Sequence, residues 1–375
     1  MPSSFIFSRA GVGLLAGVLA LATGCKKDSD MGVSTVAALP RTVSFVQSGL
    51  YPEGTQYDSQ SGRFLVSSET AGKIGQVTAD SIDESSTYTY STFADNDQLI
   101  STVGLNLDAS RNRLLAAVSD PGYNTTRTSS ATLRKLAAVA IFNRSTGTLN
   151  QFINLSNLAD ATKPHFANDI AIDAQGNAYV TDSFAPIIYK ITFDALGQGT
   201  PSVWLTNSAL SAPAGAFGLN GIVYHPSGYL LVAKSDEGKL LKIPLTTVAG
   251  TTTTTPGTIT TVALPTGLNL LGADGLQLVD NTTLYAACNA QGKVYRLTTA
   301  SDFTAVSTTG TTGTFDTNVG GVSPYPTTLA QRIVSGPGTI TSVRASYVLY
   351  SYLNVRQAGP TPVIATFTLK RVVFK

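Results

Sequence analysis

Residues 167–173 read Ala-Asn-Asp-Ile-Ala-Ile-Asp, and phrases of the same kind recur along the chain. The other copies are PEGTQYD at 52–58, VGLNLD at 103–108, LNGIVYH at 219–225, ADGLQLV at 273–279 and, more loosely, YPTTL at 325–329. The steps are 50, 65, 52, 54 and 52 residues when anchored on Gly54, Gly104, Asp169, Gly221, Gly275 and Thr327. A period of this length indicates a stacked or radial repeat, in which residues far apart in sequence can share one site.

Each phrase is followed by a turn and further apolar runs, as in 174–182, where Ala-Gln-Gly-Asn precedes Ala-Tyr-Val-Thr-Asp. Alternating apolar residues in the phrase, and Gly, Asn, Asp or Pro in the turns, predict an antiparallel sheet of about four strands per repeat. One such sheet is too small to bury both of its faces. We therefore predict an all-β fold, a six-bladed β-propeller of four-stranded antiparallel blades.

The two ends of the array are expected to close the ring. Residues 42–47 form a strand before the first phrase, and residues 362–375 are rich in β-forming residues. Pairing the N-terminal strand into the last sheet would remove an open edge. Helical periodicity is weak after the leader, and its one short candidate, 131–140, lies in the 65-residue step, where we expect an insertion or a strand.

The first 25 residues differ in composition from the rest. Arg9 precedes an apolar stretch at 11–22, which is too short for a membrane span but suits a signal peptide. The stretch ends in Leu-Ala-Thr-Gly-Cys at 21–25, which resembles a bacterial lipobox and makes Cys25 the expected lipidation site. The alternative is an ordinary secretory signal with a chance cysteine.

These features predict three segments: a lipoprotein signal peptide at 1–24, a flexible tether at 25–40 and the propeller at 41–375. We expect export to the outer membrane or cell surface, with the membrane contacted only through the lipid. The net charge of +2 and the scattered basic residues give no electrostatic footprint for nucleic acid. The second cysteine, Cys288, lies in an apolar run and is expected to be a buried core residue without a disulfide partner.

Four repeats carry a carboxylate or an amide where the innermost strand begins. These residues are Glu53, Asn168 (followed by Asp169), Asn220 and Asp274, whereas copies two and six carry Gly104 and Thr327. In a propeller these positions would converge at one mouth of the central channel. Carboxylates and amides without thiolate or imidazole suit a hard cation, Ca²⁺ before Mg²⁺. The alternative for each residue is a role in a turn.

The phrases resemble the regucalcin/gluconolactonase family of six-bladed propellers. Glu53-Gly54 matches the family's opening Glu-Gly-Pro-x-Trp phrase, although Thr55 replaces the Pro and Tyr57 the Trp. The dipeptides at 168–169, 220–221 and 274–275 match the family's Asn-Asp, Asn-Gly and Asp-Gly in the same order, and the likeness runs from about residue 43 to 375.

The resemblance implies that Glu53, Asn220 and Asp274 hold a divalent metal, and that Asn168 faces the substrate and can complete the metal shell. We expect Asp169, the residue after Asn168, to bind the substrate as well. The resemblance also implies hydrolysis of a lactone or another ester, with the metal polarising the carbonyl. An Arg that often precedes the Asn-Asp phrase is missing here, which places sugar lactones in doubt.

The candidate catalytic bases are Asp274 and His165, an imidazole three residues before Asn168. His225, the other histidine, lies in a turn and is expected to be structural. Two main functions remain open: a calcium-dependent lactonase or esterase with a small-molecule substrate, and a non-catalytic cell-surface propeller that binds glycan or protein around a structural metal. A synthase-like propeller is a third and less favoured alternative, because its catalytic glutamate is not evident in the sequence.

Overall fold

The computed structural model describes residues 39–78, 87–248, 253–307, 314–318, 323–335 and 342–374. The predicted signal peptide, Cys25 and nearly all of the predicted tether lie outside these residues. Within them, no helix is long and apolar enough to cross a membrane.

The strands form six mainly antiparallel sheets, which we call blades and number in the chain order of their innermost strands. Blade one contains β2 (Thr55–Asp58), β3 (Arg63–Val66), β4 (Ile74–Thr78) and β6 (Tyr90–Ala94). Blade two contains β7 (Ser101–Asp108), β8 (Arg113–Ser119), β9 (Ala137–Asn143) and β10 (Leu149–Asn154). Blade three contains β11 (Ala167–Ile172), β12 (Ala178–Asp182), β13 (Ile187–Phe193) and β14 (Gly199–Thr206).

The second half of the chain supplies the other three blades. Blade four contains β15 (Leu219–His225), β16 (Tyr229–Lys234), β17 (Lys239–Thr247), β18 (Thr254–Pro256) and β19 (Thr260–Thr261). Blade five contains β20 (Ala273–Asp280), β21 (Thr283–Cys288), β22 (Lys293–Thr298) and β23 (Thr314–Asp316). Blade six contains β24 (Pro326–Ser335), β25 (Ser342–Tyr350), β26 (Thr366–Arg371), β1 (Thr42–Val46) and β5 (Thr87–Tyr88).

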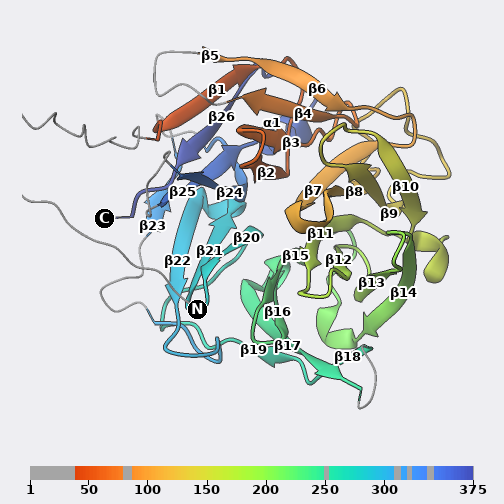
Figure 1. The fold of residues 1–375 in the computed structure, drawn as a ribbon, viewed down its shortest axis with the longest axis vertical. Coiled ribbons are helices and arrows are strands. Elements are labelled where there is room, and N and C mark those ends of the chain that lie inside the picture. Colours follow the sequence, from red (N-terminus) through yellow and green to blue (C-terminus); the bar gives the residue numbers. More distant parts are fainter. Residues whose placement is uncertain are drawn as a thin grey trace, which may run out of the picture. The chain divides into compact units, whose positions relative to one another are not determined.

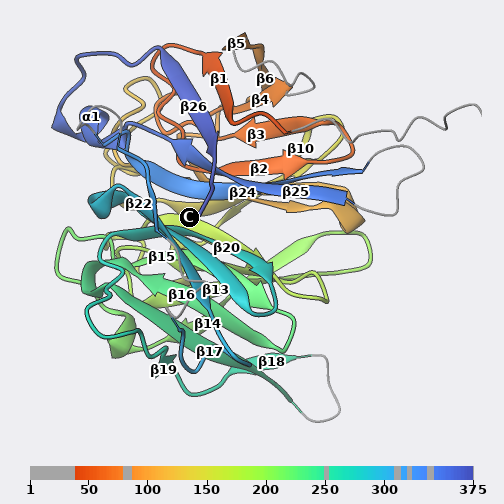
Figure 2. The same ribbon diagram turned by 90° about the vertical axis from the view of Figure 1, so that its left-hand side faces the viewer.

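Helix is sparse in the described residues. The α-helix α1 (Leu353–Ala358) lies in the connection between β25 and β26. The short 3-10 turns are η1 (Ala109–Arg111), η2 (Ser156–Leu158), η3 (Ser208–Leu210), η4 (Ser235–Glu237) and η5 (Asn289–Gln291). Figure 2 shows α1 beyond the strand ends at one face of the propeller.

The six sheets surround a central channel, with β2, β7, β11, β15, β20 and β24 innermost (Figure 1). The prediction of a six-bladed β-propeller is confirmed. Four sheets have the predicted four strands and two have five. The N-terminal strand β1 pairs antiparallel with β26, from Thr42 opposite Lys370 to Val46 opposite Thr366, so the predicted ring closure is confirmed.

The core is divided among the contacts between neighbouring blades. Six buried apolar clusters occur in the described residues, and each joins two adjacent sheets, including the last and the first. Cys288 is fully buried in the cluster between blades four and five, as predicted. His225 is buried too; its Nδ1 accepts from the backbone N–H of Ser227 and its Nε2 lies 2.9 Å from the Asn281 carbonyl oxygen.

The long repeat step reflects an insertion in blade two. Residues 120–136 form turns between β8 and β9, and β9 begins at Ala137, so the 131–140 segment is insertion followed by strand. The inner strands also approach closely around the channel, which explains the recurrent glycine of the phrase. A Cβ on Gly54 would lie 2.3 Å from the Val103 carbonyl oxygen, and one on Gly221 would lie 2.2 Å from that of Asp274.

Candidate functional site

The candidate ligands lie on β-bulges that recur in the inner strands. The pairing register of β11, β15 and β20 with the next strand shifts at the dipeptides Asn168-Asp169, Asn220-Gly221 and Asp274-Gly275. A bulge interrupts the alternation of the strand and redirects a side chain. In blade one, the backbone N–H groups of Glu53 and Gly54 both donate to Ser67 Oγ, at 3.1 and 2.7 Å, which fixes the residues before β2.

The bulges also correct the repeat alignment. The shift in β24 falls between Pro326 and Leu329, so Thr327 corresponds to Asp274, and Thr328 rather than Thr327 corresponds to Gly275. The shift in β7 falls between Thr102 and Leu105, so Val103, rather than Gly104, occupies the ligand position of blade two. The phrases in blades two and six lack the carboxylate or amide of the other copies, so the sequence alone does not show which of two adjacent residues is equivalent to the ligand. The pairing register does show it.

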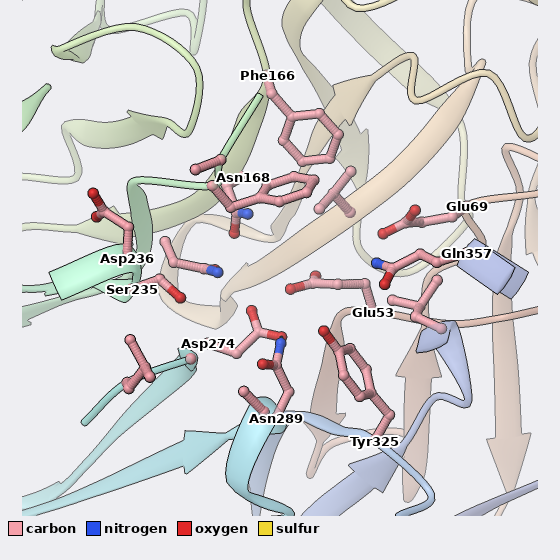
Figure 3. A pocket seen from close by; sticks show the side chains of 18 residues that line it. Glu53, Glu69, Phe166, Asn168, Ser235, Asp236, Asp274, Asn289, Tyr325 and Gln357 are labelled. Atoms are coloured by element: carbon pink, nitrogen blue, oxygen red, sulfur yellow. The ribbon is translucent and has the colours of Figure 1, made fainter. Parts of the chain in front are cut away.

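The four predicted ligands line one cavity of about 300 Å³, which we call the mouth cavity. Figure 3 shows Glu53, Asn168 and Asp274 directed toward its interior. The lining residues come from all six blades and from α1: Glu53, Glu69, Val103, Phe166, Asn168, Ala216, Phe217, Asn220, Ser235, Asp236, Leu271, Gly272, Asp274, Asn289, Ala290, Tyr325, Leu353 and Gln357.

Three of these four residues present buried oxygens without a hydrogen-bond partner. The unpaired atoms are Glu53 Oε2, Asn168 Oδ1 and Asn220 Oδ1, in side chains that are 4 to 5% exposed. The fourth residue, Asp274, is also 4% exposed, and its Oδ2 accepts from Asn289 Nδ2 at 2.8 Å. Buried oxygens without partners carry a free-energy cost that a bound cation can offset.

The carboxylates of the mouth cavity repel one another in a buried setting. Burial raises the pKa of Glu53 well above its ordinary value, and the neighbouring Asp274 charge adds to the effect. Burial also raises the pKa of Asp274 to about 7, against the opposing hydrogen bond from Asn289. Glu53, Asn220 and Asp274 line the same cavity, and Glu53 and Asn220 both act on the pKa of Asp274, so these three groups adjoin. A positive ion among them would favour their charged forms.

This donor set fits calcium better than a transition metal. The described residues contain no group of three or more His, Cys, Asp and Glu side chains placed to hold a metal. The candidate set consists instead of two carboxylates and two amides, and Ca²⁺ accepts carboxylate, amide and water oxygens in flexible geometry. Glu53, Asn168, Asn220 and Asp274 are thus the residues that would hold the ion.

The structure does not bring His165 into the mouth cavity. Its imidazole is 2% exposed, with Nδ1 2.7 Å from Asp182 Oδ2 and Nε2 3.0 Å from the Asp160 carbonyl oxygen. Burial alone would lower the pKa of His165, but the Asp182 carboxylate outweighs it and raises that pKa. Because both ring nitrogens are engaged and the imidazole does not line the cavity, the structure places His165 away from the position of a general base predicted from the sequence.

The His165–Asp182 pair instead fixes a wall of the mouth cavity. Asp182 Oδ1 accepts from the backbone N–H groups of Phe166 at 2.9 Å and of Phe184 at 3.1 Å. The rings of Phe166, Phe184 and Phe217 pack together with centroids 5.0 to 5.3 Å apart. Phe166 and Phe217 form part of the apolar lining.

Asp169 also lies away from the mouth cavity. It lines a second cavity of about 290 Å³ formed by the inner strands of all six blades, which we call the channel cavity. Its Oδ2 accepts from the backbone N–H of Ile222 on the next blade at 3.2 Å, and its Oδ1 accepts from that of Ile170 at 2.8 Å. Burial raises the pKa of Asp169 to about 7. Its place therefore differs from the substrate-facing one predicted from the sequence.

The sequence reasoning missed a second set of polar lining residues. Glu69, Ser235 and Asn289 each donate a backbone N–H to the carbonyl oxygen two residues before the candidate ligand of their own blade, at 3.3, 2.8 and 2.9 Å. Ser183 and Ser351 occupy the same place in blades three and six. The residue at this position of the repeat is polar in all five of these blades. This recurrence could have been recognised in the sequence.

The described structure resembles solved six-bladed propellers, whereas no protein-family model and no curated protein matches the chain in sequence. The major allergen Mala s 1 of Malassezia sympodialis has a TM-score of 0.62 at 17% identity, with 89% of this chain and 96% of that chain covered. A calcium-binding protein, regucalcin, from Agrobacterium tumefaciens gives 0.51 at 17% identity, with 91% and 98% covered. A putative gluconolactonase gives 0.51 at 14% identity, with 89% and 93% covered.

These comparisons establish the class of protein at the level of the fold. The chain is a six-bladed β-propeller, and propellers described as regucalcin and as a putative gluconolactonase are among its structural neighbours. The resemblance predicted from the repeated phrases is confirmed to that extent.

Proposed function

We propose that this propeller is a calcium-dependent hydrolase that cleaves a lactone or another ester in its mouth cavity. The observation that carries the proposal is the group of unpaired buried oxygens of Glu53, Asn168 and Asn220, which line one cavity together with Asp274. One structural neighbour is a calcium-binding protein and another is a putative gluconolactonase, and both descriptions support the same chemistry.

The residues of the cavity have separate tasks in this proposal. A bound calcium ion would polarise the substrate carbonyl and stabilise developing negative charge on its oxygen. Asn168 positions the ester beside the carboxylates. Asp274, oriented by the hydrogen bond from Asn289, accepts a proton from the attacking water and returns it to the leaving oxygen as the C–O bond of the ester breaks. Phe166, Phe217 and Leu353 cover the apolar part of the substrate and exclude water.

A panel of lactones and aryl esters, assayed with and without a calcium chelator, tests the proposal. We expect cleavage of at least one compound class, loss of that activity with chelator and recovery on adding calcium. Asn168→Ala should keep calcium, because both carboxylates remain, while turnover falls as substrate positioning is lost. Calcium binding without cleavage of any compound would contradict the hydrolase and favour a propeller that binds glycan or protein around a structural metal.

We further propose that the chain is exported and held at the outer membrane or cell surface by lipid on Cys25. The lipobox-like sequence at 21–25 and the short apolar stretch before it support this location. Several acyl chains bind a membrane firmly, whereas one binds marginally. Cys25→Ser should therefore move the protein from the membrane fraction to the soluble fraction, and a wild-type protein already soluble after cell fractionation would contradict the anchor.

A further inference from the structure

The mouth cavity has an acidic lining beyond the candidate calcium ligands. Among its lining residues, four are acidic and none is Lys, Arg or His. Two of the four, Glu53 and Asp274, belong to the candidate calcium set. The other two, Glu69 and Asp236, lie at opposite sides of the cavity in Figure 3.

Asp236 is already neutralised by the protein. Lys234, whose side chain is 1% exposed, places Nζ 2.5 Å from Asp236 Oδ1 and 3.2 Å from Glu237 Oε1. This lysine lies at the end of β16, behind the lining, and does not itself line the cavity. Asp236 therefore contributes little net charge to a ligand inside.

Glu69 has no comparable ion pair among the described residues. It is 6% exposed, and its backbone is fixed because its N–H donates to the Tyr51 carbonyl oxygen and its own carbonyl accepts from Ser101 Oγ at 2.5 Å. Burial raises the pKa of Glu69 to about 8, the Asp274 charge adds to this, and Arg356 opposes it. Without a positive partner Glu69 therefore holds a proton at neutral pH, and a cation beside it would favour its charged form. The Arg356 guanidinium is engaged elsewhere, 4.6 Å from the centroid of the Tyr123 ring.

Aromatic rings complete the surroundings of this carboxylate. Tyr325, Phe166 and Phe217 line the same cavity as Glu69. An organic cation gains from a nearby carboxylate and from the face of an aromatic ring, most of all where water is excluded. An anionic group in the same place would find no basic side chain among the lining residues to receive it.

The charges can then be assigned to two positive partners. A bound calcium ion would balance Glu53 and Asp274, which leaves Glu69 for a second positive partner. We infer that the mouth cavity selects ligands bearing a protonated amine beside an apolar ring or chain, and that Glu69 is the residue that sets this preference. The inference rests on the proposed function in one respect, that the mouth cavity is the substrate site. The substrates would then be esters or lactones that carry an amine.

Three small probes of one shape test this preference: benzylamine, benzyl alcohol and benzoate, titrated by calorimetry into the calcium-loaded full chain. We expect benzylamine to bind about tenfold more tightly than benzoate, with the alcohol between them, because the charges interact in a water-poor cavity. Glu69→Gln should remove most of this difference while calcium content stays unchanged. Glu237→Gln is the matched control, since it removes the same charge outside the cavity and should preserve the difference.

The inference would be overturned if benzoate bound as tightly as benzylamine, or if Glu69→Gln left their ratio unchanged. Loss of calcium from Glu69→Gln would also overturn it, because Glu69 would then belong to the ion's ligands. Binding of these probes requires no turnover. A chain that cleaves no ester but prefers benzylamine through Glu69 would thus contradict the proposed reaction and support the inferred ligand class.

Discussion

The mouth cavity and the channel cavity are built from the same repeated phrase but treat their polar groups differently. In the channel cavity, Gln56 Nε2 donates to the Leu105 carbonyl at 2.9 Å and Asn106 Nδ2 to the Ile170 carbonyl at 2.7 Å, each on the next blade. In the mouth cavity, the oxygens of three candidate ligands have no partner.

This difference separates residues that hold the ring together from residues that are available to a ligand. A buried polar group is normally hydrogen-bonded, so a group of unpaired ones indicates a missing partner. The two kinds of residue are only a few positions apart: Asn106 lies three residues after Val103, the blade-two residue at the ligand position. The bulge in each inner strand lets one phrase serve both purposes.

The largest effect is expected for Asp274→Ala in the mouth cavity. Removing this carboxylate should weaken calcium binding by at least about 100-fold, since even loss of an outer partner of a ligand costs 10- to 100-fold. Wild-type protein should gain about 2.7 kcal/mol of unfolding free energy at a calcium concentration 100 times the Kd. The variant should gain almost none at the same concentration, as measured by denaturant unfolding with and without calcium. A gain equal to that of the wild type would remove Asp274 from the calcium site.

A smaller effect is expected at the wall, for His165→Gln. The raised pKa of His165 means that its protonated form adds stability, in full below the ordinary value of 6.5. This stability is lost as the pH rises through the raised pKa. The groups that face the ring are Asp182, the Tyr189 hydroxyl at 3.3 Å and the Asp160 carbonyl.

Wild-type protein should therefore exceed His165→Gln in unfolding free energy by about 1.5 to 3 kcal/mol at low pH, the range for hydrogen bonds to charged groups. The difference should shrink on the alkaline side of the titration, while calcium content stays the same. Denaturant unfolding at a series of pH values measures it. A difference independent of pH would mean that the imidazole stays neutral in the folded protein.

The smallest effect is expected in the channel cavity, for Asn106→Ala. This change leaves the Ile170 carbonyl without its side-chain donor and should cost about 1 to 2 kcal/mol of unfolding free energy. Calcium binding and turnover should both remain, whereas the same substitution in the mouth cavity, Asn168→Ala, should keep calcium but lower turnover. If Asn106→Ala impaired calcium binding, the distinction between the two cavities would fail.

The fold could be predicted from the sequence because the repeat is periodic and its strands alternate. The phase of the phrases also placed Glu53, Asn168, Asn220 and Asp274 together, and the structure brings them to one cavity. The pairing of β1 with β26 could be predicted because an edge strand exposes unpaired backbone N–H and C=O groups, and a partner strand covers them.

What the sequence left undetermined was the direction of individual side chains. Asn168 and Asp169 are adjacent, yet the bulge directs one into the mouth cavity and the other into the channel cavity. His165 is close to Asn168 in sequence, but its pairing with Asp182, the last residue of β12, holds its side chain away from the site. Leu353 and Gln357 reach the cavity on α1, which follows no repeat.

Calcium titration of chelator-stripped protein by calorimetry tests the central claim, that the unpaired oxygens of the mouth cavity form a metal site. Wild-type protein should bind one calcium ion per chain, Glu53→Gln should lose that binding, and Asp169→Asn in the channel cavity should retain it. Absence of binding in the wild type, or equal binding in Glu53→Gln, or loss of binding in Asp169→Asn alone would contradict the account.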